Sequence, residues 1–378
     1  MKLKDICIIQ SGGTPSRSKK EYWENGTIPW VKISDFSAKH IINTQESITE
    51  QGMNCSSAKL FPKGTLLYTI FATIGEVGIL DIDATTNQAI VGIMIKNSMV
   101  DQEYLYYYLL SLKDYVNRIG RGVAQNNINM SILRELEIPL PPIEKQKKIS
   151  DIFIQLDKMI EQRQSQIDLI DELVKSRFIE MFGDENNSKK WDIVNVENVA
   201  DVQVGVVIKP SQYYTDKNEG IKAFRSLNVG EGYIKDSEWV YFSKEGHQKN
   251  SKSILKENDL LIVRSGTPGT ACVVTKDYVG SNTIDLIIAH PNCEKVNPYY
   301  LCTFTNMPHG KKQISEGIGG AAQQHFNVGK YNKLKLMLPP MKIQNKFVEF
   351  LRETDKSKYY NFTSYKYCVL AANLIRQE

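Results

Sequence analysis

The sequence lacks the residue groupings that mark metal and catalytic sites. Its six cysteines include no C-x-x-C pair, and its five histidines show neither H-x-E nor H-x-x-x-H spacing. A protein metal site needs clustered ligands, so no metal site is expected. The dipeptide Pro-Asp, the serine motif G-x-S-x-G and the phosphate-binding motifs G-x-G-x-x-G and G-x-x-x-x-G-K-[ST] are also absent. Nothing in the chain therefore argues for catalysis.

Long hydrophobic runs are absent too, which argues against a membrane-spanning segment. The start from Met1 to Asp5 is charged and no apolar signal core follows it. Cysteines without a pairing pattern in 378 residues favour reduced, buried thiols and a cytoplasmic location. The 47 basic and 43 acidic residues leave a net charge of +4, which permits a nucleic-acid partner without requiring one.

The dominant feature is the stretch from Pro139 to Met181, whose apolar residues recur in alternating steps of four and three. This heptad stripe predicts a helix that packs against another helix. Pro142 suits a helix start and Gly183 suits a helix end. A helix of about forty residues would be roughly 60 Å long. The expected packing residues are Ile149, Phe153, Leu156, Ile160, Ile167, Ile170 and Val174.

The motif that opens this helix occurs twice. Leu140-Pro141-Pro142 with Gln146 recurs 198 positions later as Leu338-Pro339-Pro340 with Gln344. Weaker matches at similar shifts run through the sequence before each motif, so the chain is predicted to hold two copies of one α/β (α+β) unit. We expect globular domains at 1–140 and 184–338 and spacer helices at 141–183 and 339–378. The second helix, with packing residues Ile343, Phe347, Phe350 and Leu351, is expected to return antiparallel to the first as a coiled coil.

Basic and amide side chains gather in the Gly-containing loops. Arg, Asn and Gln make bidentate contacts to base edges and Lys contacts phosphates. The alternative for any single residue is an ordinary solvated loop. The predicted DNA-binding residues are Arg17, Lys19, Lys20, Lys32, Arg121, Arg225, Arg264, Thr267, Lys311, Lys312 and Gln324.

Two short motifs have both a functional and a structural interpretation. Asn297-Pro298-Tyr299-Tyr300 is similar to the Asn-Pro-Pro-Tyr motif of amino-methyltransferases, but an Asn cap followed by Pro equally explains a helix start. The segments from Gly75 to Gly78 and from Gly266 to Gly269 suit either tight turns or anion-binding loops. The structural interpretation is the expected one in both cases.

Together these motifs resemble the specificity subunit of type I restriction–modification systems. The resemblance rests on the duplicated Leu-Pro-Pro helices with Asp157-Lys158 and Asp355-Lys356, on Asp259-Leu260-Leu261 with Gly269, and on Gly122 with the segment from Gln125 to Ile128. It implies that each globe is a target recognition domain for one half of a bipartite double-stranded DNA sequence. It also implies paired helices that dock two methyltransferase (modification) subunits, which recruit restriction subunits. S-adenosylmethionine, ATP and Mg²⁺ would then belong to partner subunits, with no cofactor in this chain.

Two other functions remain open on the sequence alone. A stand-alone DNA-modifying enzyme would bind S-adenosylmethionine tightly as an isolated chain. A coiled-coil scaffold with two protein-binding domains would retain no DNA in a sequence-dependent way, even with partners present.

Overall fold

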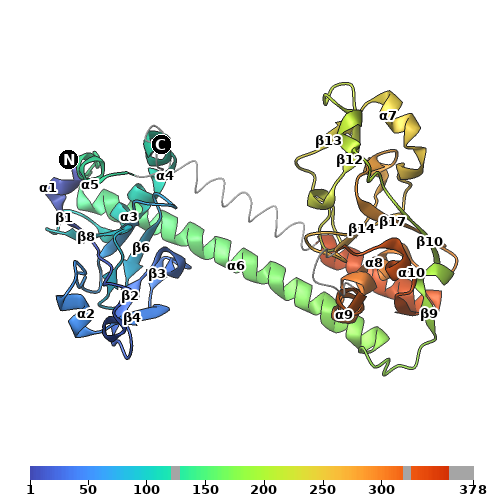
Figure 1. The fold of residues 1–378 in the computed structure, drawn as a ribbon, viewed down its shortest axis with the longest axis horizontal. Coiled ribbons are helices and arrows are strands. Elements are labelled where there is room, and N and C mark those ends of the chain that lie inside the picture. Colours follow the sequence, from blue (N-terminus) through green and yellow to red (C-terminus); the bar gives the residue numbers. More distant parts are fainter. Residues whose placement is uncertain (121–127, 318–324, 357–378) are drawn as a thin grey trace. The chain divides into compact units, whose positions relative to one another are not determined.

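The computed structural model describes residues 1–120, 128–317 and 325–356, which form two compact units (Figure 1). Unit 1 extends to Ser165 and unit 2 begins at Gln166. The helix α6 (Ile143–Phe182), 40 residues long, contributes to both units. Both units mix helices and strands, which confirms the predicted fold class. The second spacer helix is described over 341–356, and its predicted continuation lies outside the described residues.

Unit 1 is built on a large and a small sheet. The large sheet has the order β1 (Cys7–Ser11), β8 (Ile90–Ile95), β5 (Leu66–Thr69), β6 (Val77–Leu80) and β3 (His40–Ile41). The small sheet has the order β4 (Glu46–Ile48), β2 (Ile28–Val31) and β7 (Thr85–Thr86). The helices are α1 (Leu3–Ile6), α2 (Glu50–Asn54), α3 (Gln102–Ser111), α4 (Lys113–Gly120) and α5 (Met130–Glu135).

Unit 2 repeats this plan. Its large sheet has the order β10 (Ala200–Val204), β17 (Leu286–Pro291), β14 (Leu260–Val263) and β15 (Ala271–Val273). The small sheet has the order β11 (Tyr214–Thr215), β13 (Val240–Phe242), β12 (Ile221–Phe224) and β16 (Asn282–Thr283), while β18 (Lys335–Met337) pairs with β9 (Ile193–Asn195). The helices are α7 (Lys244–Lys249), α8 (Pro298–Asn306), α9 (Pro308–Gly317), α10 (Val328–Asn332) and the helix over 341–356.

The strand pairing confirms the predicted duplication. The order β1-β8-β5-β6 matches β10-β17-β14-β15, and every pairing within both sets is antiparallel. In the small sheets, β2 lies antiparallel to β4 and parallel to β7, just as β12 lies antiparallel to β13 and parallel to β16. The large sheets therefore share a four-stranded scaffold, to which unit 1 adds β3, whereas the small sheets differ in strand number and in their loops.

The heptad stripe of α6 is the less exposed face of the helix along its whole length. At the N-terminal end Phe153 is 4% exposed within the core of unit 1, and Ile149 and Leu156 pack against that core. At the other end Val174 packs against the core of unit 2, in which Phe178 is fully buried. The two ends of the stripe thus pack on the units themselves, and not solely on the second helix as expected from the sequence.

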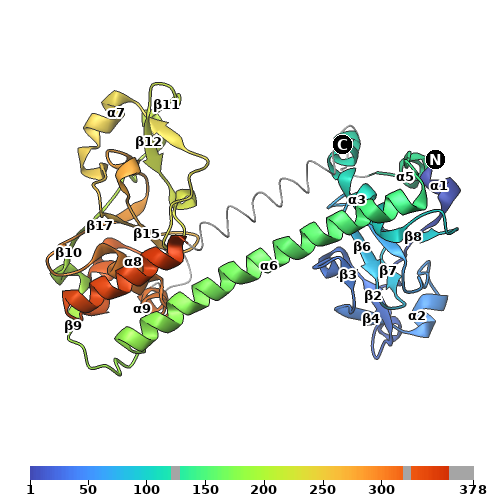
Figure 2. The same ribbon diagram turned by 180° about the vertical axis from the view of Figure 1, so that it is seen from behind.

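The second helix packs beside the end of α6 within unit 2 (Figure 2). The ring of Phe347 lies 5.4 Å from that of Phe178 and 5.2 Å from that of Phe182, measured between centroids. Ile343, Phe350 and Leu351 are partly buried against the same core. Gly183 ends α6 with a φ of +91°, and its N–H donates to the carbonyl of Ile179. This C-terminal glycine was predicted correctly.

The glutamine of the first Leu-Pro-Pro motif anchors α6 to unit 1. The Gln146 side chain is fully buried. Its Oε1 accepts the N–H of Asp101 at 2.9 Å, and its Nε2 donates to the carbonyls of Met99 (2.9 Å) and Pro141 (2.8 Å). Asp101 in turn caps α3. One amide group therefore joins the start of α6 to the start of α3.

The second motif repeats the same anchor in unit 2. Gln344 is fully buried, and its Oε1 accepts the N–H of Asn297 at 2.8 Å. Its Nε2 donates to the carbonyls of Pro339 (2.8 Å) and Lys295 (3.4 Å). Asn297 caps α8 through the N–H of Tyr299. The segment from Asn297 to Tyr300 is thus a helix start, as predicted.

Some local expectations need correction. The helical segment after β8 is divided into α3 and α4 at Leu112. Of the described cysteines, which form no disulfide among themselves, Cys55 and Cys293 are exposed because they lie in surface loops between regular elements. None of the described helices is long and apolar enough to cross a membrane.

Candidate nucleic-acid interface

The small sheets place two basic residues in equivalent positions. Lys32 directly follows β2, and its N–H donates to the Asp35 carboxylate at 2.8 Å. Arg225 directly follows β12, and its N–H donates to the Asn228 side chain at 3.0 Å. In both units a short 3₁₀ helix follows, η2 (Ile33–Asp35) or η5 (Ser226–Asn228). One local fold thus presents a cation at the end of the central strand in each unit.

In unit 1 this edge carries a cluster that we call cluster 1, formed by Arg17, Lys32, Glu46, Trp23 and Trp30. The Glu46 carboxylate accepts from both cations at 2.6 Å. The Arg17 guanidinium carbon lies 3.6 Å from the Trp23 ring centroid and 4.8 Å from that of Trp30. The two rings meet edge to face, and Trp30 is buried. Arg17 is therefore held in place by stacking and by an ion pair.

Electrostatics in cluster 1 favour the ionised carboxylate. The hydrogen bond from Lys32, with a further one from Arg17, lowers the pKa of Glu46 despite partial burial. The Arg17 side chain remains 52% exposed and that of Glu46 30% exposed. One carboxylate faces two cations, so the cluster keeps a surplus of positive charge at the surface.

Unit 2 carries a similar group, cluster 2, formed by Lys222, Asp236, Trp239 and Tyr278. Lys222 Nζ lies 3.0 Å from Asp236 Oδ1, 4.7 Å from the Trp239 ring centroid and 5.1 Å from that of Tyr278. Trp239 Nε1 donates to the same carboxylate at 2.6 Å. Both rings pack against the buried Phe224. The ammonium group is thus held over two aromatic rings that are anchored in the core.

The carboxylate of cluster 2 is also ionised. The hydrogen bond from Lys222, followed by that from Trp239, lowers the pKa of Asp236. Nearby, Arg225 donates through Nη2 to the carbonyl of Glu238. Its buried Nε has no hydrogen-bond partner among the described residues. The two clusters use residues that are not equivalent by sequence, as expected if the units recognise different surfaces.

A second basic position lies at the β14–β15 turn of unit 2. Arg264 Nη1 pairs with Asp285 at 2.5 Å, and its Nε donates to the carbonyl of Phe326 at 3.2 Å. Ser265 Oγ lies 2.6 Å from His325 Nδ1. Gly266 and Gly269 have φ values of +84° and +86°. The segment that suited an anion loop or a turn is therefore a tight turn, with Arg264 mostly buried beside it.

Arg17 and Lys32 meet at the Glu46 carboxylate, and the other described members of the predicted set have different partners. Lys19 donates to the Tyr22 hydroxyl at 2.9 Å, and Lys20 lies 3.9 Å from Glu24 with its side chain 84% exposed. The remaining positions have the following surroundings: Thr267 accepts the N–H of Thr270 through its carbonyl, Lys311 pairs with Glu231, and Lys312 pairs with Glu185. Arg121 and Gln324 lie outside the described residues.

Sequence reasoning missed Lys222, together with the carboxylates and the aromatic rings of both clusters. Glu46 is 29 positions from Arg17, and Asp236 is 14 positions from Lys222, so no local spacing reveals either pair. Tryptophans near apolar strands also suit an ordinary core. The available signal was weak: Trp23 and Trp30 follow closely after the basic loop that contains Arg17.

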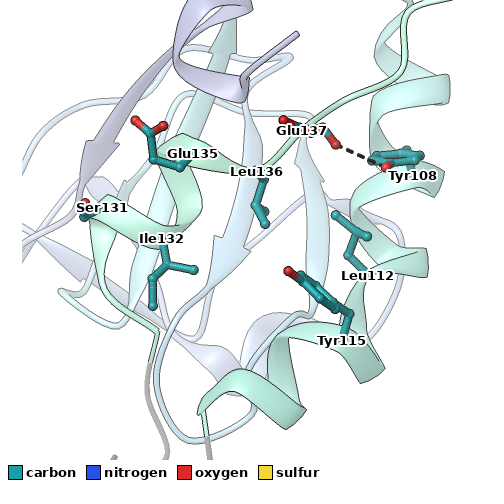
Figure 3. Close-up of a pocket in the computed structure, with 8 residues that line it drawn as sticks. All are labelled: Tyr108, Leu112, Tyr115, Ser131, Ile132, Glu135, Leu136 and Glu137. Carbon is teal, nitrogen blue, oxygen red and sulfur yellow. Dashed lines mark hydrogen bonds between the residues drawn. The ribbon is translucent and has the colours of Figure 1, made fainter. Parts of the chain in front are cut away.

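The residues of the described ranges contain no group of His, Cys, Asp or Glu arranged to hold a metal ion. An opening of about 590 Å³ lies between α3, α4 and α5 of unit 1 (Figure 3). It is lined by Tyr108, Leu112, Tyr115, Ser131, Ile132, Glu135, Leu136 and Glu137, and Tyr108 donates to the Glu137 carbonyl. None of the predicted DNA-binding residues within the described ranges lines this opening, so it is separate from the two clusters.

Comparison with known proteins gives one consistent family. The model of the type I restriction modification DNA specificity domain matches residues 1–170 and 188–360. The MjaIX specificity subunit of a type I restriction enzyme from Methanocaldococcus jannaschii is 27% identical over 372 residues, covering 92% of this chain and 84% of that protein. The EcoR124I/EcoR124II specificity subunit from Escherichia coli is 28% identical over 163 residues, 42% of this chain and 40% of that protein.

Solved structures agree at the level of the fold. A structure described as the S subunit of a type I restriction-modification system from M. genitalium matches with a TM-score of 0.58 and 14% identity, over 100% of this chain and 94% of that one. A chain from a study of type I system assembly matches with a TM-score of 0.62 and 16% identity, over 100% and 95%. With two family matches that follow the duplicated units, the chain belongs to the type I restriction modification DNA specificity family.

Proposed function

We propose that this chain is the specificity subunit of a type I restriction–modification complex and reads a bipartite double-stranded DNA sequence. Each unit would recognise one half of the target. The observation that carries the proposal is the combination of one repeated scaffold with two different small sheets. Similar scaffolds place one small sheet in each unit, while different surface residues on these sheets allow each unit to recognise a different half-site.

The charge of the clusters supports a DNA partner. Cluster 1 has two cations for one carboxylate, and Lys222 of cluster 2 lies on β12, which Arg225 directly follows. Arg and Lys side chains supply both base-edge and phosphate contacts in protein–DNA complexes. The net charge of the whole chain is only +4, so we expect weak DNA binding by the isolated chain and stronger binding in a complex.

The proposed partners are two modification subunits and, through them, restriction subunits. The relatives are named as specificity subunits of restriction enzymes, which supports a recognition role for this chain with catalysis elsewhere. S-adenosylmethionine, ATP and Mg²⁺ would then be bound by the partners. We expect the isolated chain to bind no S-adenosylmethionine in calorimetry, and tight binding would favour a stand-alone enzyme.

The decisive experiment is single-molecule sequencing of modified bases in host DNA with and without this gene. Loss of a two-part methylated adenine motif on deletion, with recovery on complementation, would support the proposal. If no motif depends on the gene, a pull-down of the tagged chain distinguishes a silent modification subunit from a scaffold. A catalytically active modification subunit that co-purifies with the chain but methylates no two-part motif in vitro would contradict the recognition role.

A further inference from the structure

The two clusters share an arrangement that simple phosphate binding does not need. In each, a partly exposed cation lies over two aromatic rings and pairs with a partly exposed carboxylate. The exposed fractions are 52% and 30% for Arg17 and Glu46, and 36% and 60% for Lys222 and Asp236. The same arrangement of cation, aromatic rings and carboxylate occurs at the small sheet of both units, although the residues that form it are not at equivalent positions.

A contribution to folding stability does not explain the ion pairs of Arg17 with Glu46 and of Lys222 with Asp236. Ion pairs with this exposure add little to the folding free energy, because water and salt screen them. The rings need no cation for their packing. Trp30 is buried in an apolar cluster against which Trp23 packs, and Trp239 and Tyr278 pack against the apolar cluster that contains Phe224. What the rings and the carboxylate do is hold each cation in one position at the surface. Such preorganisation favours binding, because little side-chain freedom remains to be lost.

The carboxylate indicates what kind of DNA group would be bound. A carboxylate beside a cation weakens its attraction for phosphate, so these pairs are poorly suited to contact the backbone. A base-pair edge in the major groove, by contrast, presents acceptors and donors side by side. Guanine offers N7 and O6 to Arg or Lys, and the paired cytosine offers its N4 amino group to Glu or Asp.

We propose that Arg17 with Glu46, and Lys222 with Asp236, each recognise the major-groove edge of one G·C base pair, one pair in each half of the target. This inference rests on the proposed function and specifies its chemistry. In unit 1 Lys32 also binds Glu46, which fixes the carboxylate for its contact with cytosine. Trp23 and Trp30 act as positioning residues for Arg17.

The test compares a variant that keeps the positive charge with variants that neutralise the carboxylate, each in the full complex with its modification subunits. Arg17→Lys keeps the cation but loses the planar fork, and Glu46→Gln removes the negative charge and puts an NH2 donor in place of one acceptor oxygen. We expect both to relax the same single position of one half-site by about 5- to 150-fold in discrimination, read from the methylated motif. Asp236→Asn should relax one position in the other half only.

Matched controls are Arg134→Lys, on an exposed position of α5, and Glu24→Gln, on an exposed surface site. Neither should change the motif. Competition binding in 50–200 mM salt provides the second readout. If Glu46→Gln tightens binding to all sequences equally, or if Arg17→Lys leaves every position unchanged, the pair contacts phosphate or is structural and the inference is wrong. A wild-type complex without any motif would instead refute the proposed function itself.

Discussion

The Gln146 side chain shows how a polar residue can determine a junction between elements. It pairs with three backbone groups at the starts of α3 and α6, all in a site that excludes water. Replacement by Ala leaves a buried N–H and two carbonyls without this partner. Gln146→Ala should therefore lower the free energy of unfolding of unit 1 by about 2–4 kcal/mol in urea titrations.

The control for this prediction is Gln155→Ala, at an exposed position of the same helix, which should change stability by less than about 0.5 kcal/mol. Equal effects of the two substitutions would refute the anchoring role. The sequence shows the duplicated motif, but it does not show the structural role of the glutamine in it. A glutamine in a helix with charged neighbours looks exposed, and only the fold reveals the backbone groups that it meets.

The lowered pKa of Glu46 predicts how the stability of the fold depends on pH. Hydrogen bonds from Lys32 and Arg17 hold its pKa below the ordinary value of 4.5. A lowered pKa means that these bonds stabilise the fold above that value and that the benefit is lost as pH falls through the lowered pKa. Glu46→Gln should cost up to about 1 kcal/mol at pH 7 and less at pH 3, in urea unfolding at both values. A cost for Glu46→Gln that grows in acid would contradict the assignment.

At the scale of elements, α6 combines a predicted stripe with buried residues outside it, among them Phe178. The heptad spacing correctly identified the less exposed face from Ile149 to Met181. It missed Phe178, because a stripe drawn for a partner helix does not anticipate a globular core at the helix end. The core of unit 2, with Tyr300 and Phe347, contacts a wider part of the surface of α6 than a single partner helix would contact.

Phe178→Ala should consequently destabilise unit 2 by about 3–5 kcal/mol, since it removes a fully buried ring. Hydrogen exchange should show lost protection in unit 2 while the sheets of unit 1 stay protected. Leu173→Ala, 51% exposed on the same helix, serves as the control and should change stability by less than about 0.5 kcal/mol. Equal loss of protection in both units would show that they fold as one cooperative body.

At the scale of the molecule, the duplicated unit and the α+β class followed from the sequence, because repeated motifs keep their order and spacing. Clusters 1 and 2 could not be predicted from the sequence, because their residues come from separate strands and loops that only the tertiary fold brings together. Replacing residues 1–140 by the matching segment of a relative should change one half of the methylated motif. Replacing residues 184–338 should change the other half, and single-molecule sequencing would detect either change.

Each unit also closes on itself at its two ends. In unit 1 the N–H of Leu3 donates to the carbonyl of Leu136, and that of Ile138 donates to the carbonyl of Met1. In unit 2 the N–H of Val196 donates to the carbonyl of Leu334. A segment that enters and leaves at one point, next to the same glutamine anchor, can be exchanged as a cassette. Recombination between the two coding repeats would then combine existing units into new pairs without inventing a new junction, so new specificities can arise faster than point mutation alone would allow.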